Sequence, residues 1–581
     1  MSHFKTKGAL GALELKGFGG IDRKTPINKN VCASLVKNFR VLPDGSLKKR
    51  CGYKFLTSFM NAIRAVYTGY IDGRFEVYVL SGDLLYKYDM NIGRQTLMKQ
   101  IGTTSGKASF FYYYGHLYLL DGAEIYDIVG QTVTVAKGYI PLYGKDWRDS
   151  YAGEVNEPLN LLTPKARISY IIGDPPTAFL DTVYTVSSVD AVYVNGELIS
   201  SDRYRIDDEF KTVNVRDLSA GDRVLMYLTF DSSAVDRSSL AKNTCATVFG
   251  GIFNSRVFMW GGERGDVMFS SRHVSEDAYK ASEAVLAGSG SLYFPADHEF
   301  SVGDGRYAIS AVSRHYDRLL IFTEGEGWMA DSEASGLEEF PVMRINAERG
   351  CLSAGGCAKC ENDPITVSDG AILRWTSNTD ELEDCNAYSI SDGISDLLSE
   401  NFFKNAVVYA DKARREIYFT DSTAVGSRII VYGTENRQWY IYNDVSADIF
   451  FDMDGEVAFV NDREIYIFDD SLCQDILPDG NIRSIDALYT VENIDFGYRS
   501  RTKRLKGVEL VGDLSEQEIT LEFESDAGVH TAHSFVGDGS GKIRSHSARL
   551  NSDRFVRTSM TLRCEGDMPQ RIYSMTVTAK E

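Results

Sequence analysis

Four cysteines are the side chains of this sequence best suited to binding a metal. Cys351, Cys357 and Cys360 lie close together, and Cys385 follows at a distance. Four thiolates can hold zinc tetrahedrally, and a Cys-x-x-Cys pair is a usual half-site. A second such pair is missing, however, and a strand could bury Cys357 or Cys360 as a core thiol. The sequence leaves open whether these thiols bind a metal, so we assign no metal ligand and no cofactor.

Acidic residues are plentiful, so a carboxylate pair for glycoside hydrolysis is the second chemistry to consider. Sialidase-type propellers carry repeated Ser-x-Asp-x-Gly-x-Thr-Trp boxes, which Ser368-Asp369-Gly370 with Trp375 matches partly and only once. An Asp-Gly turn explains the segment equally well. The eight histidines are scattered, and no Walker loop, dinucleotide fingerprint or nucleophile elbow is present. The sequence therefore predicts no catalytic residue and a protein that is not an enzyme.

An acid-rich stretch runs from Asp380 to Asp384 and continues at Asp392, Asp396 and Glu400. Such a stretch is usually a solvated loop. If it faced a pore, it would repel phosphates, and a DNA conduit benefits because an attractive wall would hold the passing polyanion. Both interpretations stay open.

The net charge of −20 is unevenly distributed along the chain. Residues 1–55 hold twelve Lys or Arg against three acids, a balance of about +9, so the remainder carries about −29. This balance argues against a general nucleic-acid-binding surface. The basic opening is either a segment that docks to an acidic neighbour, for example another copy of the chain, or a solvated tail.

The totals favour a β-rich protein of several units. At 581 residues the chain exceeds one compact core, and its 33 Tyr and 30 Phe against 12 Pro suit pleated strands. No apolar run approaches the ~20 residues needed to cross a bilayer, and the opening lacks the apolar core of a secretory signal. Nine Cys, an odd number, are then expected to be reduced, which predicts synthesis in a cytoplasm.

One pattern recurs along the chain: a strand, a tight polar turn and a second strand. Once a separate unit between Gly144 and Leu240 is set aside, the hairpins recur about every 40–50 residues, which is typical of a propeller of four-stranded blades. Six or seven blades fit, and stacked sandwiches with coincidental spacing are the alternative. The predicted turns are centred near Gly82, Gly122, Gly262, Gly325, Gly370, Ala424 and Asp462.

The fold class predicted is therefore all-β: a β-propeller with an inserted small β-domain and a C-terminal β-sandwich. Alternation around Asn195-Gly196 predicts the insert, and period-two segments after Asp470 predict the sandwich. Ser275–Leu286 has the spacing of a short helix. The predicted units are a basic N-terminal docking segment at 1–58, first blades at 59–145, the inserted antiparallel domain at 146–239, remaining blades at 240–475, and the sandwich at 476–581.

Three segments resemble structural proteins of bacterial viruses. Gly19-Gly-Ile-Asp22 with Asn38-Phe39 and Asp44-Gly-Ser-Leu-Lys-Lys-Arg-Cys-Gly-Tyr53 resembles the opening of phage tail nozzle and tail stabilisation proteins. Val192–Leu198 with Tyr204 and Gly221-Asp-Arg-Val resembles a small β-module common in phage tail and fibre proteins. Phe496–Lys506 with Ile572–Val577 is similar to the closing sandwich of the nozzle-like proteins. The inserted domain varies between members, which leaves blade count and contacts open.

The resemblance implies a structural virion protein of the phage tail. It implies a homo-oligomer, with six copies forming a ring around the DNA exit channel and contacting the tail adaptor or other tail proteins. Double-stranded DNA would pass through during ejection without specific binding, and no small-molecule substrate is expected. The alternatives are a propeller protein that binds or depolymerises carbohydrate on the host surface, and a distal tail or baseplate adaptor.

Overall fold

The structure is a computed structural model that describes residues 10–24, 32–145, 157–182, 184–207, 209–250, 255–272, 274, 292–331, 341–376, 387–421, 427–497, 500–528 and 530–581. Strands dominate it. The described α-helices are α1 (Arg237–Ala241) and α3 (Glu400–Asn405), and the 3-10 turns are η1 (Ser201–Arg203), η2 (Ser232–Ala234) and η3 (Asp392–Leu397). No helix in the described part of the chain has the length and apolar character of a membrane span. The predicted helix at 275–286 lies outside the described residues.

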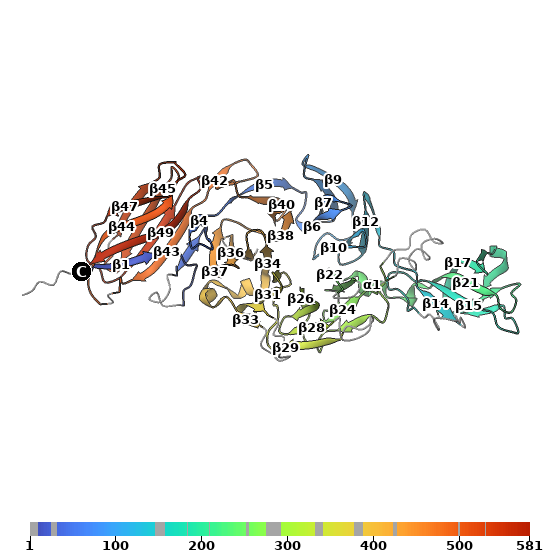
Figure 1. Cartoon of the computed structure of the whole chain (residues 1–581). Coiled ribbons are helices and arrows are strands. Elements are labelled where there is room, and N and C mark those ends of the chain that lie inside the picture. Colours follow the sequence, from blue (N-terminus) through green and yellow to red (C-terminus); the bar gives the residue numbers. More distant parts are fainter. Residues whose placement is uncertain are drawn as a thin grey trace, which may run out of the picture.

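Seven four-stranded antiparallel blades surround a common axis (Figure 1). The first strands of the blades form the hub: β6, β10 and β22 contact in succession, as do β26, β30, β34 and β38, and β38 contacts β6 again. The predicted β-propeller is therefore confirmed, with seven blades. Blades 1 to 3 are β6–β9 (Ile63–Ile71, Arg74–Ser81, Leu84–Asp89, Arg94–Gln100), β10–β13 (Ser109–Tyr113, His116–Leu120, Ile125–Val129, Thr132–Val135) and β22–β25 (Cys245–Phe249, Arg256–Trp260, Val267–Ser270, Glu299–Ser301).

The remaining blades follow the same order. Blades 4 to 6 are β26–β29 (Ile309–His315, Arg318–Thr323, Gly327–Asp331, Val342–Asn346), β30–β33 (Cys357–Cys360, Asp363–Ser368, Ala371–Trp375, Ala387–Ser389) and β34–β37 (Ala406–Asp411, Glu416–Asp421, Arg428–Gly433, Gln438–Asn443). Blade 7 is β38–β40 (Ile449–Met453, Glu456–Asn461, Glu464–Asp469) with β5 (Gly52–Ser58). The seven predicted hairpins are the second and third strands of the seven blades; the turn at Ala424 itself lies outside the described residues.

Hydrophobic layers between neighbouring blades hold the wheel together. Leu80 of blade 1 packs in one cluster with Leu119 of blade 2, and both are fully buried. Between blades 4 and 5, the rings of Phe322 and Trp375 lie 4.9 Å apart. Each such side chain contributes roughly 1.5–3 kcal/mol by burial. A hairpin alone would leave one of these faces in water, which is why the blades close into a ring.

The last blade is completed by a strand from the start of the chain. β5 pairs antiparallel with β40, with Thr57 opposite Ile465 and Gly52 opposite Asp469. The ammonium of Lys54 contacts a carboxylate oxygen of Asp469 at 2.8 Å. The ring is therefore closed by backbone hydrogen bonds between segments about 400 residues apart in sequence.

The structure differs from the prediction of a basic docking segment at 1–58. From Leu10 onward the segment supplies strands to the fold: β1 (Leu10–Leu15), β2 (Leu35–Lys37), β3 (Phe39–Val41), β4 (Leu47–Lys49) and β5. Several of its cations pair with acids of the later chain. Arg23 pairs with Asp396 at 2.9 Å and Arg40 with Glu416 at 2.6 Å. Five described cations of the segment therefore neutralise acids of the later chain: Arg23, Lys37, Arg40, Arg50 and Lys54.

The inserted domain leaves the propeller between blades 2 and 3, as the fold class predicted. It consists of a five-stranded sheet, ordered β14-β15-β21-β17-β18, and a three-stranded sheet, ordered β16-β20-β19, around a shared core. Asn195 and Gly196, both with positive φ, form its central turn. The strands are β14 (Leu142–Lys145), β15 (Lys165–Ile171), β16 (Phe179–Asp181), β17 (Val186–Val194), β18 (Glu197–Leu198), β19 (Tyr204–Ile206), β20 (Thr212–Val215) and β21 (Arg223–Phe230).

The C-terminal sandwich is joined to the propeller by a continuous sheet. β2 pairs in parallel with β37 of blade 6 and antiparallel with β43, so nine strands run from blade 6 into the sandwich. The facing sheet combines β3, β4, β49, β44 and β47, with β1 on β49. β41 (Gln474–Ile476) and β42 (Ile482–Ser484) extend the blade 7 sheet beyond β5. The later strands of the sandwich are β43 (Ala487–Ile494), β44 (Arg504–Asp513), β45 (Glu518–Ser525), β46 (His530–Val536), β47 (Arg544–Arg549), β48 (Thr558–Cys564) and β49 (Arg571–Lys580).

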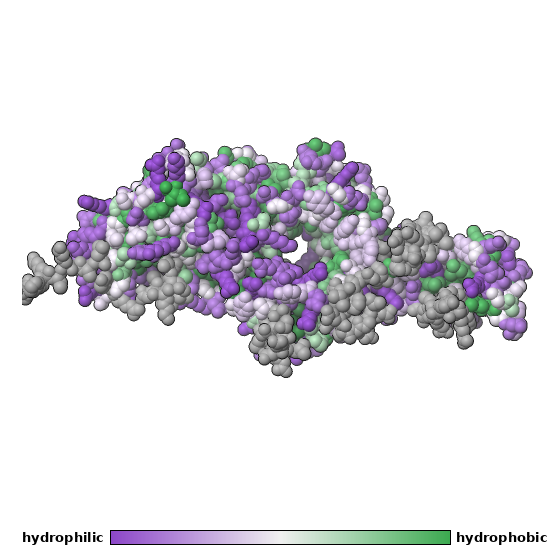
Figure 2. All heavy atoms as spheres, viewed as in Figure 1, coloured by the Kyte–Doolittle hydropathy of each residue, from purple (hydrophilic) through white to green (hydrophobic). Residues whose placement is uncertain are grey.

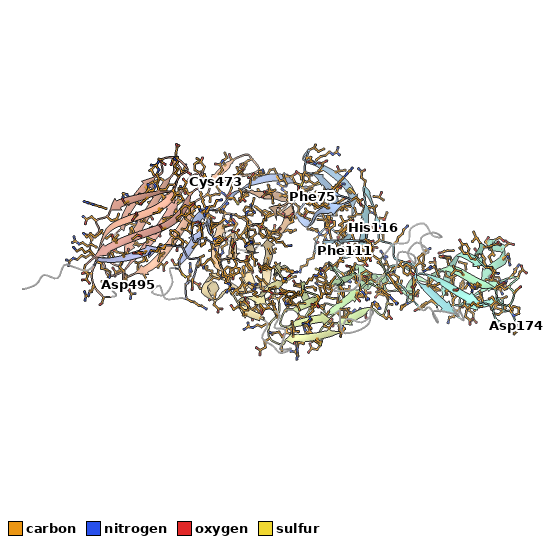
Figure 3. All side chains as sticks on the ribbon, in the orientation of Figure 1. Phe75, Phe111, His116, Asp174, Cys473 and Asp495 are labelled. Atoms are coloured by element: carbon orange, nitrogen blue, oxygen red, sulfur yellow. The ribbon has the colours of Figure 1, made fainter. Side chains whose placement is uncertain are left out.

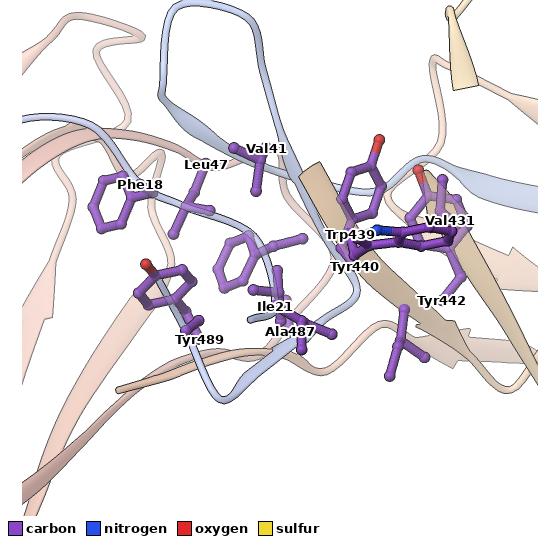
Figure 4. Close-up of a cluster of buried hydrophobic side chains, with 14 of the residues drawn as sticks. Phe18, Ile21, Val41, Leu47, Val431, Trp439, Tyr440, Tyr442, Ala487 and Tyr489 are labelled. Atoms are coloured by element: carbon purple, nitrogen blue, oxygen red, sulfur yellow. The ribbon is translucent and has the colours of Figure 1, made fainter. Parts of the chain in front are cut away.

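The junction between propeller and sandwich has a continuous apolar core (Figure 4). Phe18 and Tyr489 meet edge to face there at 5.2 Å. Gly20 is required beside Trp439, because an added Cβ would lie 2.6 Å from the Trp439 carbonyl oxygen. The sandwich and the propeller therefore share one core and form a single mechanical unit.

A buried ion pair lies next to this core. Arg50 and Asp475, each with a side chain 1% exposed, form two hydrogen bonds of 2.9 Å. The remaining guanidinium hydrogens reach the side chain of Asn38 and the carbonyls of Cys51 and Asn443. Because every donor finds an acceptor, the buried charge is fully satisfied.

The whole molecule is elongated. The sandwich and the inserted domain extend from opposite sides of the propeller, and Figure 3 places Asp495 and Asp174 at the two ends. Space filling shows the propeller hollowed at its hub (Figure 2).

Candidate functional site

The hub mouth is the most distinctive surface that the propeller builds. We define it as the end of the hub where the first strand of each blade turns into the second. Five blades make this turn with two residues, and the first of the two has positive φ in each: Asp72, Tyr114, Tyr316, Glu361 and Asp454. The same backbone position recurs around the hub while the side chains differ, so the fold presents a ring of variable side chains.

A second set of side chains lies one rung below the turns. In each of these blades, one residue of the first strand pairs with the second strand one position before the last pair of the hairpin. These residues are Tyr70, Tyr112, Arg314, Lys359 and Asp452. These five residues occupy one register position on the innermost strands of blades 1, 2, 4, 5 and 7. Their types fall into an acidic and aromatic side and a basic side.

The basic side comprises Arg314, Lys359 and Lys412, which we call the hub cations. Arg314 and Lys359 lie on the hub strands of blades 4 and 5, which contact each other, and Lys412 follows the hub strand of blade 6. Burial, followed by the like charges of Arg314 and Lys412, lowers the pKa of Lys359. The guanidinium of Arg314 also lies 5.6 Å from the centre of the Phe249 ring. Lys359 therefore lies within range of the positive charges of Arg314 and Lys412.

The opposite side of the hub mouth is acidic and aromatic. The hydroxyl of Tyr70 donates to a carboxylate oxygen of Asp454 at 2.9 Å, and this bond raises the pKa of Tyr70. Tyr70 is 63% exposed and Tyr114 of blade 2 is 54% exposed, while Tyr316, at the turn of blade 4 on the basic side, is 51% exposed.

Among the described residues, the cysteines considered as metal ligands do not form one group. Cys357 and Cys360 are three positions apart on β30, so their side chains project from opposite faces of the strand. Cys351 and Cys357 contribute to the core between blades 4 and 5, whereas Cys360 contributes to the junction core. Burial raises the pKa of the Cys351 thiol to about 12 and that of Cys357 well above its usual value. Cys385 lies outside the described residues, and no group of metal-binding side chains was found in the part described.

The partial sialidase-type box has a structural role. Asp369 and Gly370 form the tight turn between β31 and β32, and Gly370 has a φ of 74°. Trp375 is 1% exposed, and its indole N–H donates to the hydroxyl of Thr366 at 2.9 Å. The tryptophan therefore fills the layer between blades 4 and 5.

The described part of the acid-rich stretch lies between blades 5 and 6, and its acids contact nearby residues and one cation of the opening segment. Asp392 accepts a hydrogen bond from Ser389, Asp396 pairs with Arg23, and Glu400 pairs with Lys404 one helical turn away. The segment from Asp380 to Asp384 lies outside the described residues. The described histidines are dispersed as expected; for example, His116 contacts Asp127 on the next strand of blade 2.

Sequence reasoning missed the hub cations. Arg314, Lys359 and Lys412 are separated by about 50 residues each, which is the blade repeat. Aligning the hairpins by their turns would have placed Arg314 and Lys359 at one equivalent position, two residues before the turn. The sequence signal that could have identified these cations is the blade repeat, once equivalent positions of successive blades are aligned.

No family model matches this chain, and no curated protein matches it. Solved structures with similar β-architecture include exo-beta-1,3-galactanase from Phanerochaete chrysosporium (9% identity, TM-score 0.23, covering 58% of this chain and 97% of that one). The AfRom2 CNH domain matches at 6% identity and TM-score 0.35 (72% and 99% covered). A chain of the mitotic checkpoint complex matches at 10% identity and TM-score 0.33 (81% and 98% covered). These similarities say nothing about ligand or activity, and the seven-bladed ring is established by its own strand pairing.

Proposed function

We propose that this chain is a structural subunit of a bacteriophage tail, and that copies of it assemble into a ring, most simply a hexamer, around the DNA exit channel. The observation that carries the proposal is the continuous nine-stranded sheet from blade 6 into the sandwich. A tail component must transmit force without bending between its parts, and a shared sheet and core supply that stiffness. The motifs that resemble nozzle proteins include segments of this junction, among them Gly20 and Asn38.

The charge distribution supports the same proposal. The chain carries a net charge of −20, and the cations of its opening strands pair with internal acids. An acidic ring lets DNA pass, because like charges keep the polyanion off the wall. The virion tail is the corresponding location, and the tail adaptor and other tail proteins are the corresponding partners.

The proposal is tested by the assembly of the full chain. We expect mass photometry and negative-stain imaging, with and without the tail adaptor from the same virus, to show closed rings with a central hole. Duplex DNA should show no measurable affinity at physiological salt. A chain that stays monomeric with the adaptor present, or that releases sugars from host-surface polysaccharide, would contradict the proposal.

A further inference from the structure

The inserted domain has two outer faces, one on each side of its core. Alternate residues of its strands point into the shared core, for example Met226 of β21 and Leu180 of β16, and both are buried. The residues beside them therefore point outward, Leu225 from the five-stranded sheet and Phe179 from the three-stranded sheet. Since the two sheets enclose one core, these outer faces lie on opposite sides of the domain.

The outer face of the five-stranded sheet is hollowed by a groove of about 290 Å³. Ser169, Leu225 and Tyr193 form one row across three neighbouring strands and line it. The ring of Tyr227 meets that of Tyr193 edge to face at 6.0 Å, and Leu198, which is 63% exposed, lies opposite Tyr193 on β18. A cavity of about 150 Å³ already holds a benzene-sized ring. The groove therefore has room for one aromatic side chain between apolar walls.

The outer face of the three-stranded sheet carries an aromatic side chain of that size. Phe179 is 59% exposed at the start of β16, an edge strand of its sheet. It lies opposite Asn214 of β20, which in turn lies opposite Arg205 of β19, so the ring projects from a polar surface. Figure 2 shows apolar side chains at the surface of this domain. The groove and Phe179 face in opposite directions, so one chain cannot bring them together, whereas two chains can.

We propose that Phe179 of one copy inserts into the groove of the neighbouring copy, so that the inserted domains contact each other head to tail. Because the two surfaces differ, the contact is heterologous, and its repetition generates a closed ring or an open filament. The domain extends from the propeller, and Figure 3 places its Asp174 at one end of the molecule, where a neighbour can reach it. The inference rests on the proposed ring and assigns a subunit contact of that ring to the inserted domain.

The first experiment follows assembly of the full chain by sedimentation velocity at micromolar concentration. Phe179→Asp and Leu225→Glu should each weaken assembly by at least about tenfold, since each places a charge in the contact. Phe210→Asp is the matched control: Phe210 is 52% exposed at the turn between β19 and β20, and its φ of 57° suits Asp, so assembly should not change.

Mixing the two weakened variants tests the head-to-tail geometry and does not depend on comparing their stabilities. The Leu225→Glu chain keeps Phe179, and the Phe179→Asp chain keeps an intact groove. An equimolar mixture should therefore form pairs and no larger species, because each pair contains one complete contact and no second one. A variant that failed to fold could not form such pairs.

A second experiment uses cross-linking. With oxidised glutathione, Phe179→Cys/Leu198→Cys should give a ladder of covalent multimers on a non-reducing gel, while the native chain and each single variant stay monomeric. Assembly that Phe179→Asp leaves intact, a mixture that forms no pairs, or covalent dimers of Phe179→Cys alone would each overturn the inference. Loss of assembly in Leu225→Glu but not in Phe179→Asp would overturn it too, because something other than Phe179 would then occupy the groove.

The two proposals fail in different ways. Closed rings of the native chain without a covalent ladder would refute this contact and leave the proposed ring in place. A ladder from open filaments would refute the ring and support the contact. A native chain that neither assembles nor cross-links would refute both.

Discussion

Asp475 holds the counter-charge for Arg50, and its removal is the sharpest test of how the propeller is joined to the sandwich. In Asp475→Ala, the guanidinium of Arg50 loses two hydrogen bonds of 2.9 Å while remaining buried. The backbone N–H of Tyr53 and the side chain of Arg483 lose an acceptor as well. Leaving one partner of a buried pair uncompensated costs about 3–5 kcal/mol.

The assay is hydrogen exchange of β5, followed by mass spectrometry. If the closing strand opens more easily by about 3–5 kcal/mol, exchange of its amides should accelerate by roughly two to three and a half orders of magnitude, at about 1.4 kcal/mol for each tenfold step. The double variant Arg50→Met/Asp475→Leu should recover most of the loss, because an apolar pair needs no counter-ion. Asp479→Ala, an exposed change in the same connection, is the control.

The reasoning is refuted if Asp475→Ala accelerates exchange by less than about tenfold while the chain remains folded. It is also refuted if the apolar double variant is no better than the single one. Either result would mean that the ion pair adds little to the closure and that the apolar junction carries it alone.

Three further predictions concern the same architecture. Trp375→Ala should destabilise the propeller by about 3–5 kcal/mol, because it empties the layer between blades 4 and 5; urea denaturation checks this, and a loss below about 1 kcal/mol would contradict it. Gly52→Ala should weaken closure of blade 7, since the new Cβ would lie 1.9 Å from the Gln474 carbonyl oxygen; unchanged exchange of β5 would argue against that reading. Hydrogen bonds from Lys54 and Ser471 lower the pKa of Asp469 from 3.8 to about 2. Because the pKa in the folded state is depressed, the stabilisation is present above pH 3.8 and is lost as the pH falls to about 2. The urea midpoint should fall less over this range in Lys54→Met than in the native chain, since only the hydrogen bonds from Ser471 remain.

The local part of the fold could be predicted from the sequence, because the residues that form a hairpin are close together in the chain. The alternation around Gly82 and Asp462 indicates strands and turns without reference to the rest of the chain. The repeat length then predicts the propeller, since each hairpin needs neighbours on both faces. The sandwich and the inserted domain were predicted from the two regions in which the spacing of the hairpins changes.

The long-range part could not be predicted in the same way. Nothing near Gly52 shows that this strand completes the blade that begins at Ile449, because the pairing depends on geometry across the whole ring. For the same reason the basic residues of the opening seemed free to dock elsewhere, although Arg40 and Arg50 have partners more than 370 residues away. The hub cations were missed because three charges become a cluster only when the blade positions are superposed.

Both ends of the described chain lie in one pair of strands, and this has a consequence for synthesis and for pulling forces. β1 and β49 run antiparallel, with Leu10 opposite Lys580, so tension applied at the two ends would separate this pair one hydrogen bond at a time. The propeller would bear little of this tension until the strands of the sandwich had separated. During translation, β5 is made before the other strands of the propeller and cannot pair until its partner β40 has been made. β1 is made earlier still and has to wait for β49.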